Sequence, residues 1–94
     1  MDHTYSIYYE LNNPQIDYPI LQAYLLQTFS ISIRVGEKMW FVNSTNPASV
    51  IRTGIINALG PGGKILIVFN VGTAWAIDNL PQNVDIWLQN NWNP

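Results

Sequence analysis

The sequence has no cysteine, one histidine and no long apolar run. Without cysteine, a disulfide, a thiolate metal site and a cysteine nucleophile are all excluded, and a reducing cytoplasm is the default location. No apolar segment approaches the roughly 18 residues that a membrane-spanning helix needs. The opening residues, MDHTYSIYYEL, also lack the basic segment and apolar core of a secretory signal. We therefore predict a cytoplasmic protein that does not associate with a membrane.

Charged residues are scarce, at 11% of the chain, and the formal net charge is -2. The four bases, Arg34, Lys38, Arg52 and Lys64, are scattered along the sequence. Nucleic-acid binding needs clustered bases that neutralise phosphates, so the sequence predicts no nucleic-acid partner. Asparagine and glutamine supply much of the polar surface instead, and neutral polar groups lose water more easily than charged ones. Such a surface favours contacts with other proteins or with a second copy, and compositional bias of the source genome explains it equally well.

The first half of the chain predicts a strand, a helix and a hairpin. Polar and apolar residues alternate over 5–11, which places Tyr8 on the strand face opposite Tyr5 and Tyr9. A helix follows, with Asp17 as its cap, and continues to about residue 29. Residues 30–35 alternate again and turn back at Gly36-Glu37 into a strand over 39–43.

The second half contains a helix with clear boundaries, a buried strand and a closing helix. Asn46 can cap the helix, Pro47 suits its first position, and Gly60 ends it. Within residues 64–71, KILIVFNV, the five residues 65–69 are apolar without alternation, which is typical of a strand covered on both faces. Helical spacing of apolar residues over 84–92 predicts a short terminal helix.

The order of these elements predicts one domain over residues 1–94 with an α+β fold. Strand, helix, strand, strand, helix, strand is the ferredoxin-like βαββαβ order. We expect a four-stranded antiparallel sheet with two helices on one face, followed by the C-terminal helix.

Several short motifs resemble a known family. Residues 9–14, Tyr-Glu-Leu-Asn-Asn-Pro, with Asp17-Tyr18, resemble the opening of small prokaryotic ferredoxin-like proteins labelled SinR-like. These are relatives of VapD and of the non-integrase subunit of CRISPR adaptation complexes. Residues 39–42, 65–68 and 87–88 are similar to the family's later strands and last helix, so the resemblance covers most of the chain.

The resemblance implies a metal site at Glu10. In that superfamily an acidic residue at the end of the first strand is proposed to bind a divalent metal across the two-fold axis of a homodimer and to support phosphodiester hydrolysis. Only Glu10 occupies the matching position, and it is a glutamate where the family pattern has aspartate. The other interpretation of Glu10 is a solvent-facing strand end.

Aromatic residues provide the candidate binding groups. Tyr8, on the face opposite the core side of its strand, can anchor a protein interface. Trp75, Trp87 and Trp92 lie in the terminal segment, which we expect to pack back onto the domain or onto a second copy.

Two functions follow from these patterns. The first is a non-enzymatic, homodimeric protein-binding module of prokaryotic or phage origin, with no cofactor. It would act in or against a defence system, for example as an anti-CRISPR-type inhibitor, a version that rests on small size, composition and fold analogy. The alternative is a metal-dependent homodimeric nuclease of the CRISPR-adaptation-subunit or VapD type, in which Glu10 from each subunit holds Mg²⁺ or Mn²⁺. An RNA-binding sheet would need bases beside its aromatic residues, and these are missing.

Overall fold

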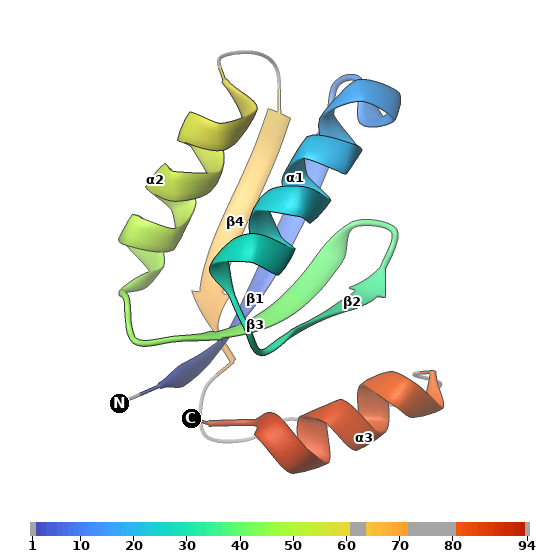
Figure 1. The fold of residues 1–94 in the computed structure, drawn as a ribbon, viewed down its shortest axis with the longest axis vertical. Helices are drawn as coiled ribbons and strands as arrows, with labels where there is room; N and C mark the ends of the chain where they lie inside the picture. Colours follow the sequence, from blue (N-terminus) through green and yellow to red (C-terminus); the bar gives the residue numbers. More distant parts are fainter. Residues whose placement is uncertain (1, 61–63, 72–80, 94) are drawn as a thin grey trace.

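The computed structural model describes residues 2–60, 64–71 and 81–93. It has an α+β architecture with a four-stranded antiparallel sheet and three helices (Figure 1). The strand order is β2-β3-β1-β4, which is compatible with a ferredoxin-like fold. The elements are β1 (His3–Leu11), α1 (Pro14–Thr28), β2 (Ser32–Gly36), β3 (Met39–Ser44), α2 (Ala48–Leu59), β4 (Lys64–Asn70) and α3 (Gln82–Asn91).

One face of the sheet is covered by α1 and α2 and holds the hydrophobic core. The register pairs Tyr5 with Val42 and Ile7 with Trp40, so alternate residues of β1 and β3 point to the same side. Figure 1 shows α1 and α2 side by side over the strands. Full burial of each large apolar side chain contributes about 1.5–3 kcal/mol. The buried cluster consists of Tyr5, Ile7, Tyr9, Leu21, Leu25, Phe29, Trp40, Val42, Ile51 and Ile55.

The first helix begins earlier than the sequence pattern predicts. Pro14 is its first residue, and Asn13 precedes it without a side-chain cap. The carbonyl of Asn13 accepts hydrogen bonds from the backbone N–H groups of Ile16 and Asp17, at 3.1 and 2.9 Å. Proline suits this first position because its φ is already helical and it has no N–H to satisfy. The prediction of Asp17 as the cap was therefore wrong, since it lies inside the first turn.

The second helix ends where predicted but begins one residue later. Its first residue is Ala48, with Pro47 at the cap position and no side-chain cap. Asn46 donates its backbone N–H to the Ser44 hydroxyl instead, at 3.0 Å, so the predicted Asn46 cap was wrong. Gly60 ends the helix with φ +80°, a conformation that glycine adopts without strain.

A glycine in α2 allows the two helices to approach closely. Gly54 faces α1, and a Cβ built on it would overlap the hydroxyl of Tyr24. A glycine inside a helix costs about 1 kcal/mol relative to alanine. The close contact between α1 and α2 offsets that cost.

The C-terminal segment is attached to the start of β1 by a buried polar network. Thr4 donates its hydroxyl to Oδ1 of Asn43 at 2.7 Å, and its Oγ1 accepts the backbone N–H of Asn93 at 2.8 Å. The Thr4 N–H donates to the Asn93 carbonyl at 2.7 Å, and Asn43 Nδ2 donates to the Asn91 carbonyl at 2.8 Å. Thr4 and Asn43 are buried, so these bonds replace water for groups that would otherwise be unsatisfied. The network fixes α3 beside the sheet, apart from α1 and α2 (Figure 1).

None of the helices in the described residues has the length and hydropathy required to span a bilayer.

Candidate protein-binding surface

Tyr8 lies on the second face of the sheet, which is the face that α1 and α2 do not cover. Side chains alternate between the two faces along β1, so Tyr8 points away from the core. Tyr8 is half-buried, whereas its neighbours Ile7 and Tyr9 are buried beneath the helices. The register pairs Tyr8 with Met39 on β3 and with Ile67 on β4. Tyr8 therefore lies between β3 and β4 on the face opposite Tyr5 and Tyr9, which is the face that the sequence predicts.

The edge strand β4 exposes apolar side chains next to Tyr8. Ile67 and Phe69 are 49% and 46% exposed, while Leu66 and Val68 pack against the core from the other side of the strand. The prediction that this strand is covered on both faces was therefore wrong within a single chain. An apolar run shows that both faces avoid water, but it does not show which chain covers each face. Tyr8, Ile67 and Phe69 together form what we call the open face.

The tryptophans of the terminal segment differ in their positions. Trp87 on α3 stacks on Phe41 of β3, with 6.1 Å between ring centroids. Phe41 lies between Trp40 and Val42 in the strand, so it points away from the core and α3 covers part of the second face. Trp92 is half-buried just after α3. Trp75 lies outside the residues that the structure describes.

Glu10 stands at the end of β1, next to the open face, where it forms an ion pair. Its Oε1 lies 3.1 Å from Nζ of Lys38. Hydrogen bonds from Lys38 and, to a smaller extent, from the Tyr8 hydroxyl lower the pKa of the Glu10 carboxyl. The same bonds raise the pKa of Lys38 and of Tyr8. Both partners of the ion pair are exposed, so the pair positions side chains and contributes little to folding stability.

The surroundings of Glu10 bear on the metal-site prediction. Among the described residues, no group of three His, Asp or Glu side chains could hold a metal ion. A cation bound at Glu10 would have to displace the Lys38 ammonium. The second carboxylate implied by the resemblance would come from another copy, so the nuclease alternative stays a prediction.

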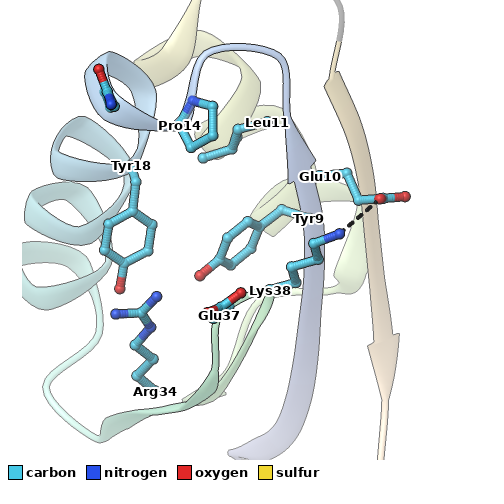
Figure 2. A pocket seen from close by; sticks show the side chains of 9 residues that line it. Tyr9, Glu10, Leu11, Pro14, Tyr18, Arg34, Glu37 and Lys38 are labelled. Carbon is cyan, nitrogen blue, oxygen red and sulfur yellow. Dashed lines mark hydrogen bonds and ion pairs between the residues drawn. The ribbon is translucent and has the colours of Figure 1, made fainter.

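A pocket of about 490 Å³ opens beside Glu10, on the side of β1 that carries α1 (Figure 2). Tyr9 forms its floor, and Tyr18 of α1 stands opposite, with 6.0 Å between the two ring centroids. The guanidinium carbon of Arg34 lies 4.3 Å from the Tyr18 ring centroid. The remaining lining residues are Glu10, Leu11, Pro14, Gln15, Glu37 and Lys38.

The sequence patterns missed several residues of these sites. Lys38 is 28 positions from Glu10 along the chain, and only the antiparallel pairing of β1 with β3 brings the two together. The sequence contains few charged residues, so the opposite charges of Glu10 and Lys38 could have suggested that the two form an ion pair. The pairing of Arg34 with Tyr18 has no local signal, because it depends on how α1 lies against the β2–β3 hairpin.

The comparisons with protein-family models, with curated proteins and with solved structures found no match to this chain.

Proposed function

We propose that this chain is a non-enzymatic protein-binding module that holds another chain against its open face. The observation that carries the proposal is the contrast at β4. Its sequence is that of a strand covered on both faces, yet Ile67 and Phe69 stand about half exposed. Covering apolar surface contributes about 25 cal/mol per Å², so a partner on this face gains stability from these side chains. Tyr8 beside them adds an aromatic anchor with a hydroxyl, a residue type enriched at protein interfaces.

A second copy is the first partner that we propose. A two-fold interface uses the same patch on both subunits, and a patch of Tyr8, Ile67 and Phe69 has no like charges to oppose each other. Static light scattering tests this form of the proposal. The expected mass is twice that of one chain, and Ile67→Ser with Phe69→Ser should return the protein to a monomer.

A matched control separates the open face from exposed apolar residues in general. Leu26 on α1 is 56% exposed, so Leu26→Ser removes a comparable apolar group from the helical side. We expect this variant to remain dimeric. A wild-type monomer, or equal dissociation in both variants, would contradict the homodimer.

A partner of different sequence is tested by capture. The immobilised chain is exposed to prokaryotic lysate, and retained proteins are identified by mass spectrometry. The proposal expects one protein that binds the wild type and the Leu26→Ser variant and is lost from the double variant at Ile67 and Phe69.

A narrower form of the proposal places the chain in or against a prokaryotic defence system, where it would act as an anti-CRISPR-type inhibitor. Its support is the small size, the sparse charge and the family resemblance, and its test is loss of CRISPR interference in cells that express the chain.

We further propose that the chain has a ferredoxin-like fold and is not an enzyme. The order β1-α1-β2-β3-α2-β4, with strand order β2-β3-β1-β4, supports a ferredoxin-like βαββαβ domain with an added C-terminal helix. The ion pair of Glu10 with Lys38 supports a structural role for this carboxylate. Cleavage of RNA or DNA with Mg²⁺ or Mn²⁺ that disappears in Glu10→Ala would refute the non-enzymatic part.

A further inference from the structure

Arg34 lies in the pocket beside Glu10, and no acidic residue in the described part of the chain forms an ion pair with it. Its guanidinium lies against the Tyr18 ring, and its Nε donates to the carbonyl of Gly36 at 2.8 Å. Among the described residues, the structure places no carboxylate within ion-pair distance of Arg34. A guanidinium held in this way has two terminal amino groups that can bind a carboxylate through parallel hydrogen bonds.

Two tyrosine hydroxyls lie near this guanidinium. The Tyr18 hydroxyl accepts the indole N–H of Trp40 at 3.3 Å, so its own proton is directed to another acceptor. The Tyr9 hydroxyl is buried and has no partner with hydrogen-bond geometry, although Tyr18 and Trp40 lie close enough for weak hydrogen-bonding contacts that affect its pKa. Figure 2 shows it turned toward Tyr18 and Arg34. Burial raises the pKa of Tyr9, which keeps its hydroxyl protonated and available as a donor.

The remaining lining restricts the charge of a ligand. Glu10 already neutralises Lys38, while Glu37 adds a negative charge at the rim. One unpaired arginine therefore matches one negative charge, and a phosphate dianion would be repelled by the rim acids. Leu11 and Pro14 form an apolar wall at the far end from Arg34 (Figure 2).

We propose that this pocket binds a monoanionic carboxylate that carries an apolar group. The carboxylate is held by Arg34 and Tyr18, and it supplies the acceptor that the buried Tyr9 hydroxyl lacks. Because the Tyr9 hydroxyl is buried in the free protein, ligand entry requires a neighbouring side chain to move. The apolar group rests on Leu11 and Pro14. This site is separate from the open face and does not depend on the protein-binding proposal.

A titration followed by NMR tests the ligand class and its source. The probes are N-acetyl-L-leucine, which mimics a chain terminus, 4-methylpentanoate, which is the free acid without the amide, N-acetyl-L-leucinamide and inorganic phosphate. Both carboxylates should saturate and shift the Arg34 Nε–H resonance, and the amide should bind about 10-fold or more weakly. Tighter binding of N-acetyl-L-leucine assigns a peptide C-terminus, whereas equal or tighter binding of 4-methylpentanoate assigns a free acid. Binding of the amide or of phosphate as tight as that of the carboxylates, or no saturable binding at all, would overturn the proposal.

Two variants and one control variant test the roles of Arg34 and Tyr9. Arg34→Gln should weaken carboxylate binding about 10-fold or more, while Arg52→Gln, an exposed arginine on α2, should leave it unchanged. Tyr9→Phe should weaken binding several-fold without lowering the thermal midpoint of the free protein, because it removes a buried hydroxyl that has no partner. Unchanged binding in Arg34→Gln, or a Tyr9→Phe protein that loses stability while binding normally, would refute these roles.

Discussion

The two faces of the sheet are built from the same strands but are covered in different ways. On the helical face, Ile7 and Val42 are completely buried beneath α1 and α2. On the second face, α3 and the C-terminal residues cover the lower part through Thr4 and Phe41, while Ile67 remains about half exposed. The first face is closed by contacts within one chain. The second is partly closed by α3 and the C-terminal residues, and Ile67 and Phe69 of β4 stay about half exposed.

We expect the two faces to differ most in the free energy of unfolding lost when an isoleucine on each face is replaced by alanine. Ile7→Ala should cost about 2–5 kcal/mol in the free energy of unfolding, because it leaves a cavity in the core. Ile67→Ala should cost less than about 1 kcal/mol in dilute protein, because the side chain is already half in water. Urea unfolding at low protein concentration measures both values. Equal losses would mean that the second face is packed as tightly as the first.

The polar attachment on the second face should give the next largest effect. Thr4→Val keeps the shape but removes the hydroxyl shared by Asn43 and Asn93. The buried Oδ1 of Asn43 and the partly buried backbone N–H of Asn93 then lose their partner. We expect a loss of about 1–3 kcal/mol. Thr53 is the control, because its hydroxyl donates to the Ser49 carbonyl on an exposed part of α2. Thr53→Val should change the unfolding free energy by less than about 0.5 kcal/mol, and a similar loss in both variants would contradict the importance of the network.

A smaller effect is expected where the helices meet above the first face. Gly54→Ala gains about 1 kcal/mol of helix propensity but forces Tyr24 to move, so we expect a net loss of about 1 kcal/mol. In a Tyr24→Phe background the hydroxyl is absent, and the same substitution should be neutral or stabilising. Thermal unfolding of the four proteins gives the coupling energy. A coupling energy near zero would show that the hydroxyl does not limit the approach of α1 and α2.

We expect the smallest effect from the ion pair of Glu10 and Lys38 at the rim of the pocket. Lys38→Gln should raise the pKa of Glu10 toward its ordinary value, and Tyr8→Phe should raise it less, because Lys38 is the stronger cause of the lowered pKa. NMR titration of the Glu10 side chain measures both shifts. The contribution of Glu10 to stability is present above its unfolded-state pKa and is lost as pH falls through the lowered folded-state pKa. The contribution of Lys38 is present below its unfolded-state pKa and is lost as pH rises through its raised one. A larger shift in Tyr8→Phe than in Lys38→Gln would contradict this order.

Local signals in the sequence predicted the elements well and their ends less well. Gly60 ended α2 as predicted because a residue with positive φ stops a helix without help from distant contacts. Asp17 and Asn46 were wrong as caps because α1 begins at Pro14 and α2 begins directly after Pro47, and neither helix start has a side-chain cap. The alternation of β1 placed Tyr8 correctly, since side chains on a strand must point to opposite faces.

The sequence by itself determined the order of the elements, the core side of β1 and the scarcity of charge. These follow from local periodicity, turn chemistry and composition, which need no knowledge of distant contacts. Only the tertiary structure decided that Lys38 pairs with Glu10, that Arg34 lies on Tyr18 beside a pocket, and that Ile67 and Phe69 stay exposed. Each of these depends on strand register or on the placement of a helix against a hairpin. An apolar residue shows that it prefers to be covered, but only the fold shows whether its own chain covers it.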